Sequence, residues 1–518
     1  MHDFLNDTVV EEKTGKELYA YQQDAINKLL SRLHEAPENH NILYQLPTGG
    51  GKTVIFSEVA RRYLKEIKQK VLILTHRIEL CSQTSSMLSE FGIKNKIIDS
   101  SVKELPDQDD YDCFVAMVET LNNRLQDEQF SMEGIGLVIV DEAHYNSFSK
   151  LFKYFDKSII LGVTATPLSS SIKLPMNSNY NELIVGDSIA DLVEKGFLAN
   201  ANTYTYNVNL GSLTVGITGD YTVRSSERLY ANVLMQEKLL YAYEEKSIGK
   251  KTLIFNSGIQ SSRNVQETFM EAGHEIRHLD STNSAQERKE ILHWFKHKPD
   301  AILTSVGILT TGFDEPTVES IILNRATKSL TLYHQMIGRG SRILPNKKEF
   351  DVIDLGNNAL RFGLWKDHVD WREIFTSPLS YYEAIESDEE IERNFKYEMP
   401  DEIRKEFSKS DNLFFDVKAE YKKSLSAGER PKEVIKRSVE QHAQMCMENS
   451  EDVYDARILA DLLEGDIEYR VRVYSQCLAS TTKNYAQWLC DDYKHQLRLN
   501  LSHKFDLIDQ EALDEDED

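Results

Sequence analysis

The sequence predicts an α/β protein with two parallel-sheet domains in tandem, followed by a mainly helical region. Two observations carry this prediction. Between about residues 15 and 365, short apolar runs rich in strand formers alternate with segments of helical apolar spacing, in two successive blocks. From about residue 370 the composition changes, and the segments 431–449 and 457–480 show helical apolar spacing among many charges.

The overall composition is ordinary for a globular protein. The 518 residues are 41% hydrophobic and 28% charged, and no apolar run has transmembrane length. The first 18 residues are acidic and lack the apolar core of a signal peptide. The five cysteines form no C-x-x-C pair, which argues against a disulfide framework and against a zinc site. We therefore expect a cytoplasmic protein with no membrane partner.

The net charge of −24 is unfavourable for a protein that binds nucleic acid. It is unevenly distributed, because −15 of it falls after residue 370. This part includes the acidic end EALDEDED, which we expect to be disordered. The first 370 residues can still carry a local basic track, so the charge neither excludes nor supports nucleic-acid binding.

A glycine-rich loop stands between an apparent strand and an apparent helix, in the stretch LPTGGGKTVIF. A loop in this place can direct backbone N–H groups and a helix N-terminus at an anion. Lys52 supplies a charge for the β and γ phosphates of a nucleotide, and Thr53 supplies a hydroxyl for Mg²⁺. We interpret Pro47–Thr53 as a phosphate-binding loop, although Leu46 stands where the usual pattern has its first glycine. The alternative is a flexible glycine loop with a chance lysine.

A second motif, GLVIVDEAHYNSF, supports nucleotide binding. The run LVIV is typical of a buried parallel strand, and it ends in Asp141 and Glu142. From the end of that strand, Asp141 can reach the Mg²⁺ held by Thr53, and Glu142 can orient and deprotonate the attacking water. The alternative is an ordinary strand with an acidic turn in solvent, which the loop upstream disfavours.

The second half of the chain supplies arginines but no phosphate-binding loop. The stretch LYHQMIGRGSRI indicates a helix that carries Gln335, Arg339 and Arg342. The first half has the loop and the acidic pair but no obvious arginine finger. Two incomplete halves favour one active site in the cleft between them, with Arg339 and Arg342 reaching the γ-phosphate. Taken alone, these arginines would be better explained as surface residues or as contacts with a nucleic-acid backbone.

Together these motifs resemble those of superfamily 2 helicases and translocases, over roughly residues 15–365. Eight motifs occur in the order of the family. YAYQQDAI resembles the Q motif, LTHRIEL motif Ia, MVETLNNRL motif Ib, DEAH motif II, TATP motif III, LIFNSG motif IV, TTGFDEP motif V and QMIGRGSR motif VI. The resemblance implies two tandem RecA-like domains that form a helicase core, with ATP and Mg²⁺ as cofactors and nucleic acid as partner.

The resemblance also implies roles for individual residues. The residues expected to bind ATP are Gln22, Thr48, Gly49, Gly50, Gly51, Lys52, Thr53, Gly312 and Asp314, with Thr53 and Asp141 as Mg²⁺ ligands. The residues expected to act in catalysis are Glu142, Gln335, Arg339 and Arg342. Those expected to couple the two domains are His144, Thr164 and Thr166, and those expected to contact nucleic acid are Arg77, Thr120 and Thr304.

Several features narrow the resemblance to DNA translocases. DEAH with TATP and QMIGRGSR resembles RadD-like helicases, the XPB type and type I restriction motor subunits. The DEAD-box RNA helicases usually show SAT and HRIGRTGR instead. The segment IADLVEKGFLA, at 189–199, also resembles the end of the first motor domain in the DNA-linked group. The chain departs from RadD-like proteins at Tyr19, where they usually carry arginine, and it lacks their C-terminal cysteine cluster.

The motifs define the domain boundaries that we expect. Residues 1–15 form an N-terminal extension, 16–200 the first RecA-like domain, 201–235 a connecting segment and 236–370 the second RecA-like domain. Residues 371–508 form a helical accessory region that ends in the acidic tail 509–518. Within the accessory region, the segment 380–392 is interpreted as a linker or an exposed acidic helix.

The sequence thus predicts an ATP hydrolase coupled to translocation along DNA or to its unwinding. One alternative is a nucleotide-gated DNA-binding switch with little turnover, against which the intact DEAH motif and both motif VI arginines argue. Another is the motor subunit of a multi-protein nuclease or defence complex, whose nuclease would be a separate protein. An RNA helicase is less favoured.

Overall fold

The computed structural model describes residues 18–36, 40–102, 107–169, 173–217, 219–310, 312–385, 399–410, 412–478 and 483–515. The chain divides into two compact units, Met1–Glu386 and Ser387–Asp518. The expected N-terminal extension, residues 1–15, lies outside the described residues.

The first unit contains a seven-stranded sheet with the strand order β3-β4-β2-β5-β6-β1-β7, in which all neighbours are parallel. Both faces are buried: in β2, Val71 and Ile73 belong to one apolar cluster, and Leu72 and Leu74 to another. This burial explains why the strands appear in the sequence as continuous apolar runs. The strands are β1 (Ile42–Gln45), β2 (Lys70–Thr75), β3 (Asn95–Ile98), β4 (Cys113–Met117), β5 (Ile135–Asp141), β6 (Ile159–Thr164) and β7 (Glu182–Val185).

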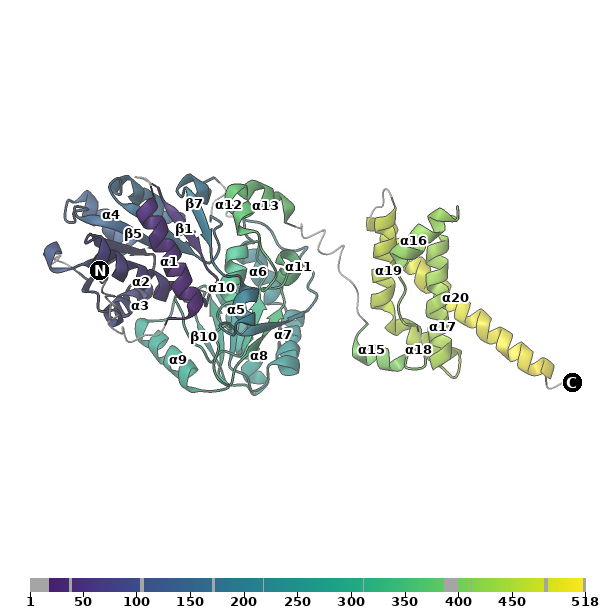
Figure 1. The fold of residues 1–518 in the computed structure, drawn as a ribbon. Helices are drawn as coiled ribbons and strands as arrows, with labels where there is room; N and C mark the ends of the chain where they lie inside the picture. The colour runs from purple at the N-terminus through teal and green to yellow at the C-terminus, as the bar shows by residue number, and fades with distance from the viewer. Residues whose placement is uncertain are drawn as a thin grey trace, which may run out of the picture. The chain divides into compact units, whose positions relative to one another are not determined.

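Helices connect these strands, as parallel neighbours require, and surround the sheet (Figure 1). The helices are α1 (Ala20–Glu35), α2 (Lys52–Glu66), α3 (Ile78–Glu90), α4 (Val118–Gln126) and α5 (Ile189–Glu194). Three 3₁₀ segments complete this domain, namely η1 (Gln108–Asp110), η2 (Asn146–Tyr154) and η3 (Met176–Ser178).

A second parallel sheet follows in the same unit, with six strands in the order β10-β11-β9-β12-β13-β8. The strands are β8 (Asn200–Thr205), β9 (Thr252–Asn256), β10 (Ile276–Leu279), β11 (Ile302–Val306), β12 (Ser320–Asn324) and β13 (Glu349–Asp354). The helices that follow β8 in this unit are α6 (Val223–Tyr230), α7 (Val233–Lys246), α8 (Ile259–Glu271), α9 (Ala285–His297), α10 (Leu330–Ile337), α11 (Asn358–Phe362), α12 (Trp371–Thr376) and α13 (Pro378–Ala384).

The segment 201–235, expected to connect the two domains, is instead part of the second one. β8 pairs with β13 along its whole length. Val208, Leu210 and Tyr230 are buried in an apolar cluster of the second domain. The sequence of this segment alternates and is polar, which is compatible with strands or with an extended connection, and in the structure it begins with the half-buried edge strand β8.

After the second sheet, the chain returns to the first domain. α12 packs against β7 and η3, and Figure 1 shows it beside β7. Phe375 is buried among residues of the first domain, and Asn177 Nδ2 donates a hydrogen bond of 3.3 Å to the Thr376 carbonyl. Residues 371–385, expected in the helical accessory region, therefore belong to the first unit, because the first domain covers the apolar face of α12.

The second unit is helical and has its own core, which includes Phe407, Val434, Leu463 and Tyr493. Its helices are α15 (Asp401–Glu406), α16 (Val417–Ser426), α17 (Glu433–Asn449), α18 (Val453–Leu462), α19 (Glu464–Cys477) and α20 (Lys483–Glu515). None of the helices in the described ranges combines the length and the apolar composition that crossing a bilayer requires. The predicted fold class, two tandem RecA-like domains and a helical C-terminal region, is confirmed.

Two acidic segments of the second half of the chain are largely helical in the residues that the structure describes. The backbone of residues 509–515 continues α20, where we expected a disordered tail, and residues 516–518 lie outside the described residues. Of the segment 380–392, residues 380–384 belong to α13, and residues 386–392 lie outside the described ranges.

We expect the chain to tolerate truncation after residue 386 but not after residue 370. The shorter protein loses α12, and with it the buried side chain of Phe375, whose burial stabilises by about 1.5–3 kcal/mol. Thermal unfolding of the two truncated proteins should show a melting temperature several degrees lower for the shorter one. Phe375→Ala in the full chain is the matched control and should reproduce much of the loss. Equal melting temperatures would show that α12 does not stabilise the first domain.

Candidate nucleotide-binding and hydrolysis site

The predicted phosphate-binding loop, Pro47–Thr53, follows β1 and leads into α2 at the carboxyl end of the first sheet. Gly49 and Gly51 have φ angles of +93° and +81°, a left-handed conformation that other residues rarely adopt. Gly51 is also the N-cap of α2. The first backbone N–H groups of a helix have no partner within it, so the bend at these glycines offers several donors to an anion.

Lys52, the first residue of α2, has only weak protein partners. Its Nζ donates to the Leu46 carbonyl at 3.3 Å and to the Pro47 carbonyl at 3.5 Å. Burial lowers the pKa of Lys52, and the nearby carboxylates of the acidic pair oppose that shift. The Thr48 hydroxyl is buried close by without a hydrogen-bond partner. A half-buried ammonium and an unpaired hydroxyl in one loop are suited to bind anionic oxygen atoms.

The acidic pair lies at the end of β5. Glu142 has a φ of +51°, a strained backbone conformation of the kind that is typical of functional sites. Asp141 Oδ1 accepts a 3.0 Å hydrogen bond from the Glu142 N–H. Burial raises the pKa of Asp141, and the Glu142 carboxylate adds to this effect. Glu142 Oε2 is buried without a hydrogen-bond partner, 3.4 Å from His144 Nδ1. The pair thus concentrates negative charge that a divalent cation would neutralise.

The second domain meets the phosphate-binding loop through the segment 338–342, which follows α10. The predicted helix through Gln335, Arg339 and Arg342 is wrong beyond Ile337, because α10 ends at the C-cap Gly338 and only Gln335 lies on it. A Cβ added at Gly338 would lie 2.6 Å from Thr48 Cβ. A Cβ added at Gly49 would lie 2.5 Å from Ser341 Oγ and 3.2 Å from Arg342 Nη1. The two segments are therefore in direct contact, and Arg342 Nη1 lies beside the loop.

Both arginines are held by the TTGFDEP segment. Arg342 Nε donates to Asp314 Oδ1 at 2.8 Å. Arg339 donates to the Thr310 carbonyl at 2.6 Å through Nη2, and to the Phe313 carbonyl at 2.5 Å through Nη1. Burial lowers the pKa of Arg339 to about 10, and the neighbouring Arg342 adds to this effect. The guanidinium groups are thus fixed before any ligand enters.

A set of hydrogen bonds joins the DEAH motif to the second domain. His144 Nδ1 lies 2.9 Å from Thr164 Oγ1, and Gln335 Nε2 lies 3.5 Å from His144 Nε2. The Thr166 hydroxyl donates to the Thr331 hydroxyl at 2.9 Å. Because Thr331 and Gln335 both lie on α10, this helix contacts the DEAH and TATP motifs together. The three predicted coupling residues therefore form one path between the domains.

Residues of the Q motif lie against the same loop. A Cβ at Gly51 would be 2.6 Å from Gln22 Nε2, and the Tyr21 hydroxyl donates to the Gly50 carbonyl at 2.9 Å. Gln22 Oε1 accepts a 3.1 Å hydrogen bond from the Tyr19 N–H. Tyr19 itself is 53% exposed, and its ring packs against that of Phe197, with centroids 4.7 Å apart.

The site fits a nucleoside triphosphate with Mg²⁺. The observation that carries this match is the presence of two buried oxygen atoms without hydrogen-bond partners, Thr48 Oγ1 and Glu142 Oε2, beside the half-buried ammonium of Lys52. The Asp141 carboxylate and the Thr53 hydroxyl are oxygen ligands of the kind that Mg²⁺ prefers. The residues that could hold both groups are therefore in place.

Two of the residues expected to contact nucleic acid are at least partly accessible. Arg77 donates to the carbonyls of Ile308 at 3.0 Å and Gly307 at 3.4 Å, so it joins the first domain to the loop after β11. Thr120 is half-buried on α4. Their roles stay predictions.

Thr304 does not fit the expected contact with nucleic acid. It is fully buried in β11, and its hydroxyl is hydrogen-bonded to Asn256 Nδ2 and Ser262 Oγ, each at 2.8 Å. A central strand buries both of its faces, which leaves this side chain no surface for a ligand. Gly312, expected near ATP, instead has its described contacts with α3, where its carbonyl accepts from Gln83 Nε2 at 2.9 Å.

The sequence reasoning missed His76 and Tyr145. The Tyr145 ring lies between the rings of His76 and His144, with centroids 4.2 Å and 4.3 Å away. Both ring nitrogens of His76 are buried without a partner, and burial lowers its pKa to about 4. The stack connects motif Ia to the DEAH motif. The signal was present, because both motifs carry an aromatic ring just after the neighbouring strands β2 and β5.

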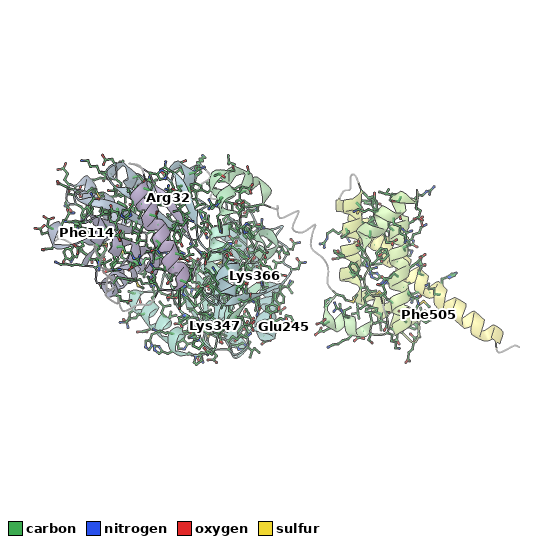
Figure 2. All side chains as sticks on the ribbon, in the orientation of Figure 1. Arg32, Phe114, Glu245, Lys347, Lys366 and Phe505 are labelled. Atoms are coloured by element: carbon green, nitrogen blue, oxygen red, sulfur yellow. The ribbon has the colours of Figure 1, made fainter. Side chains whose placement is uncertain are left out.

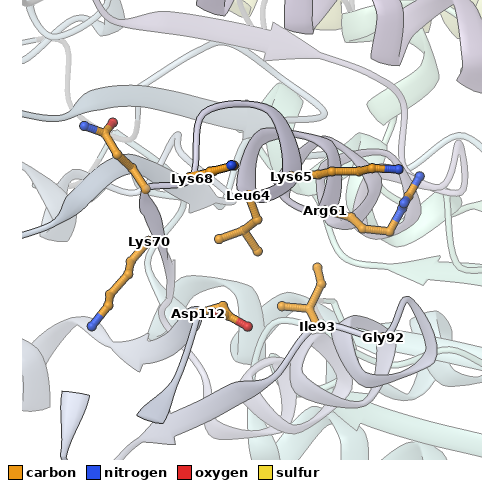
Figure 3. A pocket seen from close by; sticks show the side chains of 9 residues that line it. Arg61, Leu64, Lys65, Lys68, Lys70, Gly92, Ile93 and Asp112 are labelled. Atoms are coloured by element: carbon orange, nitrogen blue, oxygen red, sulfur yellow. The ribbon is translucent and has the colours of Figure 1, made fainter. Parts of the chain in front are cut away.

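A basic depression on the first domain lies elsewhere. Its lining side chains come from the end of α2, the start of β2 and the loops before β3 and β4 (Figure 3). This is the amino end of the sheet, whereas ligands of parallel sheets bind at the carboxyl ends. Lys70 pairs with Asp109 at 2.8 Å, and Arg61 pairs with Glu58 at 2.7 Å. Because the depression lies at the amino end of the sheet, away from the motifs, we assign it no ligand.

Comparison with known protein families identifies the same two domains. Residues 15–169 match the family described as Type III restriction enzyme, res subunit, and residues 232–344 match the family described as Helicase conserved C-terminal domain. The fold and these matches together define the class of protein, a two-domain helicase core.

The chain is similar to the Saccharomyces cerevisiae protein IRC3, described as an ATP-dependent helicase. The two are 30% identical over 354 residues, which are 64% of this chain and 50% of IRC3. The chain thus spans about half the length of this curated relative.

Two solved structures share the fold. One is a fragment assigned to the HsdR subunit of a type I restriction enzyme from Vibrio vulnificus YJ016, with a TM-score of 0.53, 20% identity and coverage of 66% of this chain and 65% of that one. The other is the Type ISP restriction-modification enzyme LlaBIII bound to DNA, with a TM-score of 0.52, 16% identity and coverage of 95% and 42%. The two family matches and the likeness to IRC3 are consistent with a superfamily 2 helicase related to restriction-enzyme motor subunits.

We expect Gly338→Ala to impair hydrolysis without unfolding the second domain. The φ of Gly338 is −58°, which alanine adopts readily, but the added Cβ would clash with Thr48 across the cleft. Turnover should fall by about tenfold or more, because small displacements of catalytic groups are costly. Nucleotide affinity, which depends chiefly on the first domain, should change by only a few-fold. Steady-state hydrolysis and binding of a fluorescent nucleotide measure the two effects separately.

Gly211→Ala is the matched control for this substitution. Its Cβ would meet only the flexible side-chain oxygen of Asn209, at 3.1 Å, and it lies outside the cleft. Normal turnover in Gly338→Ala would show that the close contact of the two segments is not needed for hydrolysis.

Proposed function

We propose that the protein is an ATP-driven motor that translocates along DNA or unwinds it. The support for this proposal is the contact between the segment 338–342 and the phosphate-binding loop, with Arg342 Nη1 within 3.2 Å of a Cβ position at Gly49. A composite site of this kind is complete only when the two domains are closed. Opening and closing of the domains is the movement that a motor on a polymer requires.

In this proposal, Lys52 and the N–H groups of the loop hold the β and γ phosphates. Thr53 and Asp141 would hold Mg²⁺, which when bound would neutralise negative charge on the phosphates. Glu142 orients the attacking water and accepts its proton. Arg339 and Arg342 stabilise the negative charge that develops on the transferred group, where a positioned donor has its largest effect.

The hydrogen bonds through His144, Thr164 and α10 would transmit changes at this site to the second domain. Arg77 of the first domain donates to the loop after β11 of the second domain. In this proposal, the two domains bind a nucleic-acid strand alternately at these places. Contacts of this kind are to phosphate and sugar, so the motor would act on DNA independently of its sequence.

DNA is the proposed polymer for two reasons. The motifs DEAH, TATP and QMIGRGSR resemble those of DNA translocases, and one structure with the same fold, LlaBIII, is a complex with DNA. The likeness to HsdR also favours a second candidate, in which this chain is the motor subunit of a multi-protein restriction or defence complex. In that case, the helical unit from Ser387 onward would bind the partner.

Hydrolysis measured with single-stranded, duplex and forked DNA, and with RNA of equal length, tests the proposal. We expect DNA to raise the rate well above the basal rate and RNA to do so less. Glu142→Gln keeps the shape of the site but cannot accept a proton, so it supplies the background rate. Stimulation by RNA alone would overturn the choice of DNA. A low rate that no nucleic acid changes would favour the nucleotide-gated switch.

We expect Arg342→Ala and Lys52→Ala to have different effects on kcat and on nucleotide affinity. Arg342 acts mainly on charge in the transition state, so its loss should lower kcat on the order of a thousandfold while nucleotide affinity changes little. Lys52→Ala should lower both affinity and turnover. Arg277→Ala, which removes an arginine stacked on Trp294 elsewhere in the second domain, is the control and should keep normal turnover. DNA-stimulated turnover within a few-fold of the parent in Arg342→Ala would contradict the composite site.

A further inference from the structure

Lys347 has an unusual environment for a lysine. It lies between the segment 338–342 and β13, on the part of the second domain labelled in Figure 2, and it is only 5% exposed. Its Nζ donates to three backbone carbonyls: Gly340 at 2.7 Å, Arg342 at 2.8 Å and Pro316 at 3.0 Å. An ammonium has three N–H donors, so all of them are in use.

These three acceptors connect the two motifs that supply the arginines of the site. Gly340 and Arg342 belong to motif VI, and Pro316 ends motif V. The Arg342 side chain is held by Asp314, and its carbonyl is held by Lys347. The ammonium thus fixes the backbone from which the guanidinium extends.

The segment 338–342 is also held by the Ala199 N–H, which donates to the Ser341 carbonyl at 2.8 Å. A Cβ at Gly340 would collide with the Phe350 ring, so the backbone lies directly on β13. Lys347 Nζ itself lies 5.8 Å from the centre of that ring. Among the described residues, no other cation donates a hydrogen bond to the carbonyl of Gly340 or of Arg342.

We propose that Lys347 is a positioning residue for ATP hydrolysis, which holds the motif VI backbone so that Arg342 reaches the phosphates. This inference rests on the hydrolysis assigned under the proposed function. Lys347 touches no substrate itself and acts through Arg342. Neither composition nor motif spacing marks it, because its partners are backbone oxygen atoms.

The charged groups around Lys347 give this role a pH dependence. Burial lowers the pKa of Lys347 to about 8, the Glu319 and Glu315 carboxylates oppose the shift, and Arg342 adds to it. Lys251 and Lys296 line the same depression. The folded-state pKa is depressed, so the ammonium is present below about pH 8 and is lost as the pH rises through that value. The neutral amine has no charge and only two N–H donors, so it holds the three carbonyls less firmly.

The experiment compares kcat and nucleotide affinity for the full-length parent, Lys347→Met, Lys347→Arg, Arg342→Ala and the double variant of Lys347→Met with Arg342→Ala. We expect Lys347→Met to lower kcat by about ten- to a hundredfold, with affinity within a few-fold of the parent. Because Lys347 acts through Arg342, the double variant should be no slower than Arg342→Ala alone. Independent losses that multiply in the double variant would overturn the proposal.

A pH profile is the second measurement. In the parent, kcat should fall as the pH rises through about 8. Lys347→Arg stays charged throughout this range, so that fall should be absent from its profile. An unchanged profile in Lys347→Arg would overturn the proposal, even if the variant were slower than the parent.

Lys251→Met is the matched control. Lys251 is also a buried lysine of the second domain, 2% exposed, but its Nζ donates to the Lys296 carbonyl at 2.9 Å, outside motifs V and VI. It should lower the melting temperature and leave kcat per folded molecule unchanged. A loss of kcat in Lys251→Met equal to that in Lys347→Met would reduce the effect to general destabilisation and overturn the proposal.

Failure of the proposed motor function has a different signature. A parent that hydrolyses ATP but does not respond to DNA contradicts the motor, while the effect of Lys347→Met on the basal rate still supports positioning. If DNA raises the rate of the parent protein but Lys347→Met keeps the parent's kcat, the result supports the motor and overturns the positioning role. A parent without any hydrolysis overturns both.

Discussion

The contact between the segment 338–342 and the phosphate-binding loop is the constraint on which the rest of the site depends. Two glycines, Gly49 and Gly338, let the backbones of different domains approach where a Cβ would collide. This approach brings the arginines of one domain to the lysine and carboxylates of the other. Buried charges of both signs are costly unless they are paired with good geometry. In the proposed function, a bound triphosphate with Mg²⁺ would supply that pairing, so nucleotide binding and domain closure would favour each other.

The two domains differ in how far their site residues are already held by protein partners. The first domain holds the unpaired oxygen atoms Thr48 Oγ1 and Glu142 Oε2, and the backbone of Glu142 is strained. In the second domain, Arg339, Arg342 and Lys347 all have close partners from 2.5 to 3.1 Å. The first domain therefore has the most to gain from a ligand, whereas the second presents groups whose positions need little change. Electrostatic catalysis requires such fixed groups, because they spend no energy on reorganisation during the reaction.

Local sequence was sufficient for the parts of the structure that local chemistry determines. The glycine bend before Lys52, the carboxylates that end β5 and the arginines after α10 each follow from short patterns with a physical cause. Features that depend on distant partners were not predicted. β8 looked like a connection, because its pairing with β13 is not visible in its own residues. Thr304 looked accessible, because only the complete sheet shows that β11 is covered on both faces. Lys347 gave no signal at all, since carbonyl acceptors leave no mark in a sequence.

The position of α10 explains how one movement can change both the chemistry and the grip on a polymer. Thr331 and Gln335 on this helix contact the TATP and DEAH motifs, and the segment that follows it carries Arg342. A rigid helix moves these groups together. Withdrawal of Arg342 from the phosphates of a bound nucleotide would therefore also disturb the contact between Gln335 and His144. The Thr310 carbonyl that binds Arg339 lies in the loop after β11, which Arg77 of the first domain also contacts. Withdrawal of the arginines after hydrolysis would therefore pull on the same loop that faces the proposed DNA path. The energetic link between the two sites then needs no long route, because the groups concerned are bonded to one helix and one loop.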